Sequence, residues 1–243
     1  MNQVTDQQII EILRKEAVPA LGCTEPVACA LACAKCKEVL GSVPERLDVL
    51  VSGNIYKNGM GVGIPGTGMV GLPIAAALGA VCGKSEYGLE VLKEVNVGDN
   101  LQRAKDMLGQ VTVSLKEDAP DKLYAEALAT KGNDTVKVII AHTHTNIVLV
   151  EKNGEEIFKR EFRLDTSKPE DKGPELSVKR IWDFVHEVDV KDIEFVLQGA
   201  EMNKAISAEG LNSEYGLQIG KTLKENIDNV SINRKQYVYD VKA

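Results

Sequence analysis

The sequence lacks an excess of positive charge. Its 243 residues contain 29 Lys and Arg against 36 Asp and Glu, so the formal net charge is −7 at pH 7. Nucleic acids and anionic membrane surfaces are bound by basic patches, and this charge balance argues against both kinds of partner. We therefore expect a protein that binds neither nucleic acid nor a membrane.

Long apolar runs and an export signal are also missing. No hydrophobic stretch approaches the roughly 20 residues that cross a bilayer. The first ten residues, MNQVTDQQII, contain neither the basic nor the apolar region of a signal peptide. These absences predict a cytoplasmic location.

Cysteine is scarce and odd in number. A chain of this length can bury a core without disulfide bonds, and it shows no export signal, so we expect reduced thiols. The question is then whether any thiol does chemistry. The five cysteines are Cys23, Cys29, Cys33, Cys36 and Cys82.

Hydrophobic spacing and glycine placement predict a helical body in the first part of the chain. Thr5 and Gln8 have the spacing of a capping box at the start of the first helix. A single strand is expected over 47–56, followed by a glycine cluster. The predicted helices cover 5–18, 25–40, 73–81, 86–95 and 98–108.

From residue 110 the pattern changes to short alternating segments. VTVSL, KLYAEALAT, TVKVII, TNIVLV and EEIFKREF predict five antiparallel strands, and Asn153-Gly154 favours a type I′ hairpin turn. Residues 166–175 are predicted to be a linker, before helices at 176–187, 190–207 and 214–226. The predicted class is α+β, with a helical domain over 1–109, a β module over 110–165, and a linker and helices over 166–243 that return to the helical body.

The segment GCTEP at 22–26 is the first candidate for chemistry. Cys23 directly precedes a predicted helix, where amide groups and the helix dipole favour an anion. This placement predicts a thiol pKa below that of a free cysteine. Glu25 lies in the first helical turn. The alternative is that Cys23 is a small buried hydrophobe.

Cys29, Cys33 and Cys36 show the C-x3-C-x2-C spacing that holds a [4Fe–4S] cluster in radical SAM enzymes. The residues between them are strong helix formers. On a helix these positions fall at i, i+4 and i+7, which is the spacing of a core stripe. We interpret the three cysteines as core residues and expect no metal site there.

A glycine-rich loop is the second candidate. Gly61-x-Gly63-x-x-Gly66 matches the dinucleotide fingerprint, but Pro65 lies inside it and no acidic strand end follows at the right distance. Dense glycine exposes amide groups that can bind a carboxylate. The alternative is a packing turn between close helices. The candidate carboxylate-binding residues are Asn54, Lys57, Asn58, Gly61, Gly63, Gly66, Thr67 and Gly68.

His142 and His144 form an HxH pair, an arrangement found in some metal hydrolases. His186 is the third histidine of the chain and lies in a distant predicted helix. No Asp or Glu stands beside the pair at ligand spacing. We therefore interpret the pair as the polar face of a strand.

Two of these segments together resemble a known family. GCTEPVA at 22–28 and SGNIYKNGMGVGIPGTGMVGLPIAAALGA at 52–80 resemble the L-cysteine desulfidase family, which is related to the α chain of iron–sulfur L-serine dehydratases. The resemblance implies a lyase that converts L-cysteine to hydrogen sulfide, ammonia and pyruvate with a [4Fe–4S] cluster and without pyridoxal phosphate. It implies that Cys23 accepts the substrate proton or, as the alternative, ligates the cluster, and that the glycine loop lines the substrate site.

The same resemblance concerns only the N-terminal half of that family. Its cluster cysteines lie in a C-terminal half that this sequence does not contain. We therefore expect an N-terminal fragment that binds no cluster and is inactive alone. The partners expected are a small amino-acid substrate and a C-terminal half or partner subunit carrying the cluster cysteines. A second copy of the chain is a further candidate partner. The alternative function is a non-enzymatic module that binds a small carboxylate or a partner subunit.

Overall fold

The structure is a computed structural model, and it describes residues 4–160, 176–214 and 218–226. The chain divides into two compact units. One contains Pro19–Asp171, and the other combines Met1–Val18 with Lys172–Ala243. The sequence-based boundary at 109/110 lies inside the larger unit, because the sheet of that unit takes a strand from before residue 109.

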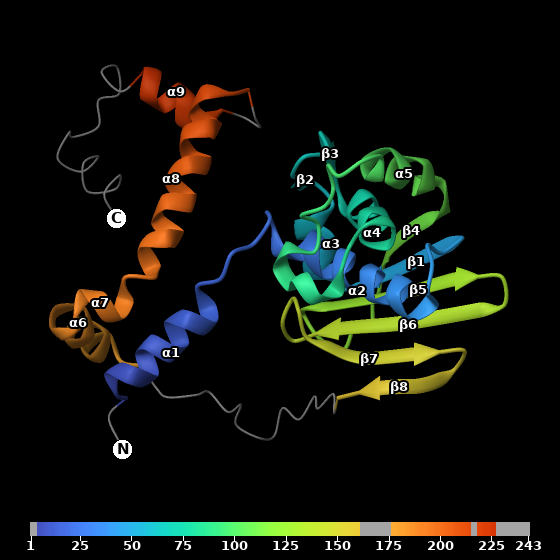
Figure 1. The fold of residues 1–243 in the computed structure, drawn as a ribbon, viewed down its shortest axis with the longest axis horizontal. Helices are drawn as coiled ribbons and strands as arrows, with labels where there is room; N and C mark the ends of the chain where they lie inside the picture. The colour runs from blue at the N-terminus through green and yellow to red at the C-terminus, as the bar shows by residue number, and fades with distance from the viewer. Residues whose placement is uncertain (1–3, 161–175, 215–217, 227–243) are drawn as a thin grey trace. The chain divides into compact units, whose positions relative to one another are not determined.

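The larger unit contains a six-stranded mixed sheet (Figure 1). Its strand order is β4-β1-β5-β6-β7-β8; β1 and β4 are parallel and the other pairs are antiparallel. The α+β class is confirmed. The strands are β1 (Arg46–Val51), β4 (Val111–Leu115), β5 (Tyr124–Lys131), β6 (Asp134–Ala141), β7 (Ile147–Lys152) and β8 (Glu155–Lys159).

The predicted β module is therefore not separate from the helical body. β1 lies between β4 and β5 and pairs with both through Leu47, Val49 and Val51. All three of these side chains are almost fully buried against the helices. The alternation that predicted one buried strand face was right. The residues that pair with this strand lie 64 to 84 positions later in the sequence, so a local pattern could not predict the pairing.

Helix α2 (Thr24–Leu40) forms the centre of the core between the sheet and α4 (Leu72–Val81). Its sequence is apolar on nearly all sides, which is typical of a fully enclosed helix. Cys29, Cys33 and Cys36 are completely buried, and the Cys36 thiol contacts the Ala127 and Val136 carbonyl oxygens of the sheet at 3.4 and 3.5 Å. The interpretation of these cysteines as a core stripe is confirmed.

Other predicted boundaries shift. The strand expected over 47–56 ends at Val51, because Ser52 begins helix α3 (Gly53–Gly59) and its hydroxyl donates to the Lys122 carbonyl at 2.7 Å. The helix expected over 86–95 is a 3-10 helix, η1 (Ser85–Glu90), since Gly88 has a positive φ of 53° that interrupts it. The rest of that stretch consists of turns.

The glycine cluster is a small hairpin of β2 (Gly63–Ile64) and β3 (Met69–Val70). Helix α3 separates it from the preceding strand, so the strand–loop–helix context of a dinucleotide site is absent from this stretch. Helix α5 (Asn100–Met107) and the short η2 (Leu108–Gln110) then lead into β4. The Asn153-Gly154 turn joins β7 to β8 with positive φ at both residues, as predicted.

The smaller unit contains five described helices. In α1 (Asp6–Glu16) the predicted capping box of Thr5 and Gln8 is confirmed. Phe184 packs with Ile9 and Ile10, and Arg180 donates to the Val4 carbonyl at 2.6 Å. The later helices are α6 (Val178–Glu187), α7 (Val190–Ile193), α8 (Val196–Asn212) and α9 (Ile219–Glu225). The predicted linker at 166–175 and residues 215–217 of the last predicted helix lie outside the described residues.

The close approach of α2 and α4 at Gly79 can be tested by substitution. A Cβ atom added at Gly79 would lie 2.1 Å from the Ala30 carbonyl oxygen, whereas one added at Gly109 meets nothing within 4 Å. Overpacking of this kind costs about 1–3 kcal/mol. We expect Gly79→Ala to lower the free energy of unfolding by about 2 kcal/mol in urea titrations followed by circular dichroism.

Gly109→Ala is the matched control and should change that free energy by less than about 0.5 kcal/mol. Equal stability of the two variants would show that α2 and α4 do not approach as closely as described.

Candidate functional site

The side chains predicted to do chemistry meet at the N-terminus of α2. Cys23 is the N-cap residue of this helix, and its thiol donates a 2.8 Å hydrogen bond to Glu25 Oε2. Asn58 on α3 donates to the other carboxylate oxygen, Oε1, at 3.0 Å. Cys23, Glu25 and Asn58, which the sequence analysis singled out from two separate segments, thus form one cluster.

The backbone before α2 places Cys23 against the glycine hairpin. Gly22 has a φ of 84°, a conformation that side-chain-bearing residues rarely adopt. A Cβ atom at this position would lie 3.1 Å from Pro65 Cγ at the hairpin turn. Glycine at position 22 therefore allows both the turn into α2 and the close approach of the hairpin.

His144 joins this cluster from a distant part of the chain. Its Nε2 lies 3.2 Å from the Thr24 hydroxyl, and that hydroxyl lies 3.4 Å from Glu25 Oε2. The interpretation of the HxH pair as a strand face is wrong, because β6 ends at Ala141 and both histidines lie in the following loop. The HxH pattern was the only local signal, and nothing in it pointed to Thr24.

The pKa of the Cys23 thiol beside Glu25 differs from the sequence-based expectation. Burial, followed by the hydrogen bond to the Glu25 carboxylate, raises the pKa of the Cys23 thiol. The backbone amide contacts at the helix start lower this pKa, as predicted, but they are weaker than the two opposing effects. The prediction of a lowered Cys23 pKa is therefore wrong, and the thiol is protonated at neutral pH.

The pKa values of both Glu25 and His144 are lowered, which leaves Glu25 ionised and His144 neutral at neutral pH. The hydrogen bond from the Cys23 thiol lowers the pKa of Glu25, and the Asn58 amide lowers it further against the effect of burial. Burial lowers the pKa of His144, and the Glu25 charge partly opposes this. At neutral pH the site therefore holds an ionised carboxylate between a neutral thiol and a neutral imidazole.

The other cysteines are buried, so we expect their thiols to be unreactive. Burial raises the pKa of Cys29 to about 12 and that of Cys33 well above its ordinary value. Cys82 is only 7% exposed, and its thiol contacts the Leu78 carbonyl oxygen at 3.3 Å. Among the described cysteines, Cys23 alone is not buried.

The remaining predicted binding residues lie beside the cluster in two groups. Asn54 and Lys57 are exposed on α3, at the i and i+3 positions of the face that carries Asn58. Thr67 is buried, and its hydroxyl donates to the Ile64 carbonyl at 2.7 Å, so it shapes the hairpin turn. The exposed glycines of the loop are Gly61 before β2, Gly63 in β2, and Gly66 and Gly68 in the turn.

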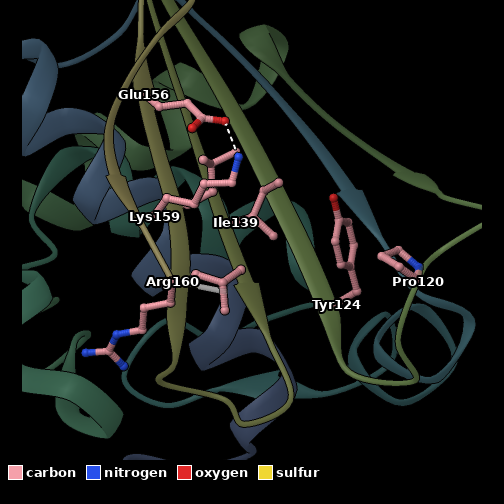
Figure 2. A pocket seen from close by; sticks show the side chains of 8 residues that line it. Pro120, Tyr124, Ile139, Glu156, Lys159 and Arg160 are labelled. Atoms are coloured by element: carbon pink, nitrogen blue, oxygen red, sulfur yellow. Dashed lines mark hydrogen bonds and ion pairs between the residues drawn. The ribbon is translucent and has the colours of Figure 1, made fainter. Parts of the chain in front are cut away.

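A pocket of about 210 Å³ lies elsewhere, on the sheet (Figure 2). Tyr124 and Ile139 line it, and the Glu156–Lys159 ion pair at 2.6 Å closes one side. The Tyr124 hydroxyl donates to Glu126 at 2.7 Å. The polar side chains named here already have partners, and none of the predicted site residues lines this pocket. We assign the candidate site by chemistry to the Cys23 cluster.

The described residues contain neither a candidate metal cluster nor a helix suited to cross a membrane. Within them, no group of three or more His, Cys, Asp or Glu side chains is arranged to hold a metal ion. None of the helices in the described part of the chain is both long and apolar enough for a bilayer crossing.

Fold and site together define an α+β protein with a thiol–carboxylate pair at the N-terminus of its central helix. Comparison with known sequences relates the chain to UPF0597 proteins. It is 45% identical over 229 residues to the one from Parabacteroides distasonis, covering 92% of this chain and 52% of that protein. It is 46% identical over 221 residues to the one from Oleidesulfovibrio alaskensis, covering 90% and 51%.

The chain is therefore a homologue of UPF0597 proteins along about half of their length. No family model matches it, and no solved structure does. The chain spans about half the length of these relatives, and their names state no activity.

The hydrogen bond between Cys23 and Glu25 generates a test of the site electrostatics. Glu25→Gln removes the negative charge that disfavours the thiolate, so the Cys23 pKa should fall although burial still raises it. We expect the midpoint of Cys23 alkylation against pH to move to lower pH and the rate at pH 7 to rise, measured with iodoacetamide and mass spectrometry.

Glu45→Gln provides the control, because Glu45 accepts a bond from the Gly132 amide and lies beyond the far end of α2. It should leave the midpoint unchanged. A midpoint in Glu25→Gln equal to or above that of the unmodified chain would contradict the described pair.

Proposed function

We propose that this chain carries the proton-accepting part of an amino-acid lyase of the L-cysteine desulfidase and L-serine dehydratase type. The reaction is the conversion of L-cysteine to hydrogen sulfide, ammonia and pyruvate. The 2.8 Å contact of the Cys23 thiol with Glu25 is the observation that supports it best. Elimination needs a base at Cα, and a thiol with an ionised carboxylate as its proton acceptor provides one.

Donors beside the cluster suit the carboxylate of an amino-acid substrate. Lys57 and Asn54 on α3 can bind that carboxylate, while the ionised Glu25 remains the acceptor of the Cys23 proton. The exposed amides of the glycine hairpin, which Pro65 brings against Gly22, add donors for the same carboxylate. An amino acid bound in this way would have its Cα between α2 and α3, next to Cys23.

The proton steps can be assigned to this chain's residues. Glu25 takes the thiol proton, and the Cys23 thiolate takes the proton from Cα. The electron pair left on Cα forms a double bond to Cβ as the Cβ–S bond breaks, and the leaving group departs as hydrosulfide. The aminoacrylate that remains tautomerises to an imine, which water hydrolyses to pyruvate and ammonia.

The resemblance to iron–sulfur lyases raises the question of a [4Fe–4S] cluster. Such a cluster would activate the leaving group as a Lewis acid. The described cysteines do not fit it, because Cys29, Cys33 and Cys36 are buried in α2 with no room for iron, and Cys23 is a single thiol. A partner half or subunit would have to supply the cluster ligands, and we derive no step through them.

The proposal predicts a strong dependence on the Cys23 sulfur. Cys23→Ser should reduce sulfide and pyruvate release from L-cysteine by roughly 10²- to 10⁴-fold, because a hydroxyl is a far weaker base at neutral pH. Release is measured anaerobically with the chain alone and with the remaining half of the Parabacteroides distasonis relative added as a separate chain.

Cys82→Ser is the matched control and should keep its activity, since a serine hydroxyl can also donate to the Leu78 carbonyl. Near-full release by Cys23→Ser would refute the role of the thiol. Saturable binding of L-cysteine with no sulfide in either assay would favour the carboxylate-binding module instead.

A further inference from the structure

His144 lies in the loop after β6, and the conformation of this loop directs its side chain toward the Cys23 cluster. A register shift between Ile139 and Ile140 interrupts the β6–β7 pairing just before the loop. The next residue after β6, His142, has a φ of 70°, a conformation that non-glycine residues adopt at an energetic cost. Bulges and strained residues of this kind redirect side chains and concentrate at functional sites.

Several contacts hold the loop in this shape. His142 Nδ1 lies 2.6 Å from the Asp121 carboxylate, and the His142 amide donates to the Leu123 carbonyl at 3.2 Å. The Asn146 side chain donates to the Ala141 carbonyl at 2.9 Å and accepts from Arg160 at 2.9 Å. The ring of His144 is thus brought to Thr24 by anchors on both sides.

The hydroxyl of Thr24 links His144 to the carboxylate. A hydroxyl has one proton to donate, and an ionised Glu25 can only accept. While His144 Nε2 carries its proton and donates to Thr24, the single hydroxyl proton of Thr24 is available to Glu25 Oε2. In the other tautomer of His144, the ring nitrogen and Glu25 compete for that one proton. The tautomer of His144 therefore affects how firmly Thr24 holds Glu25.

Few titratable groups surround this link. Glu25 faces it from α2 and partly offsets the effect of burial on the His144 pKa. Cys23 and Asn58 also contact the Glu25 carboxylate. The Glu25 charge adds to the effect of burial in raising the pKa of Cys29, one turn further along α2. Among the described groups that perturb His144, Glu25 is thus the only charged one.

We propose that His144 is a positioning residue of the Cys23–Glu25 pair, acting through the hydroxyl of Thr24. With Asn58 on one carboxylate oxygen and Thr24 on the other, Glu25 is turned toward the Cys23 thiol as its proton acceptor. This assignment rests on the proposed function, in which that pair accepts the substrate proton. It adds a third, non-local residue to the site.

The test measures the Cys23 thiol and needs no turnover. Iodoacetamide alkylation of Cys23 is followed against pH in the chain and in the variants His144→Gln and Thr24→Val. Loss of either group loosens Glu25 from the thiol, so the alkylation midpoint should move to lower pH and the rate at pH 7 should rise about twofold. Thr24→Ser retains the hydroxyl and should keep the original midpoint.

A double-mutant cycle separates positioning from simple loosening. If His144 acts through Thr24, the double variant should show the same midpoint as Thr24→Val alone. Greater access of reagent to a loosened loop would instead raise the plateau rate at high pH and leave the midpoint in place. His186→Gln is the control histidine variant and should match the unmodified chain.

An unchanged midpoint in His144→Gln, or midpoint shifts that add in the double variant, would overturn the proposal. Because the readout is the thiol itself, this result is independent of lyase activity. Failure of the proposed function would appear as intact coupling of His144 to Cys23 in a protein that releases no sulfide.

Discussion

The burial of helix α2 on all sides is the constraint on which the rest of the structure depends. From Val27 to Ala34 every side chain is at most 1% exposed, with the sheet on one side and α4 on the other. Small residues allow this close packing, and Gly79 of α4 leaves no room for a side chain against Ala30. A helix enclosed in this way cannot rotate, so its N-terminus has one position at the edge of the core.

That fixed N-terminus explains why the candidate site lies there. Cys23 and Glu25 come from the start of α2, Asn58 from α3 and His144 from the loop after β6, so three segments converge on one helix end. The convergence also explains the charge states. Partial burial and the thiol–carboxylate bond keep the proton on sulfur, and the same bond keeps Glu25 ionised.

The sequence predicted local structure better than long-range assembly. The capping box at Thr5, the end of α2 at Leu40 and the Asn153-Gly154 turn depend on neighbouring residues, and the structure confirms them. The pairing of β1 with β4 and β5 does not depend on local pattern, and it was missed. For the same reason Cys23 and Glu25 were found from one short segment, whereas the role of His144 required a contact across 120 residues. The prediction of a lowered Cys23 pKa was wrong because it considered the helix start without the burial of the thiol and its hydrogen bond to the Glu25 carboxylate.

The central claim is that the Cys23–Glu25 pair accepts a proton from an amino acid. The most direct test of this claim is the exchange of an α-proton with solvent. L-Alanine has no leaving group at Cβ, so base action on it can only exchange its α-proton with solvent. The measurement is the α-proton signal of L-alanine in D₂O, followed by NMR in anaerobic solution with the chain and with Cys23→Ser. The account predicts that the signal decays with the chain and persists with the serine variant. A signal that persists in both, or decays equally in both, would contradict it.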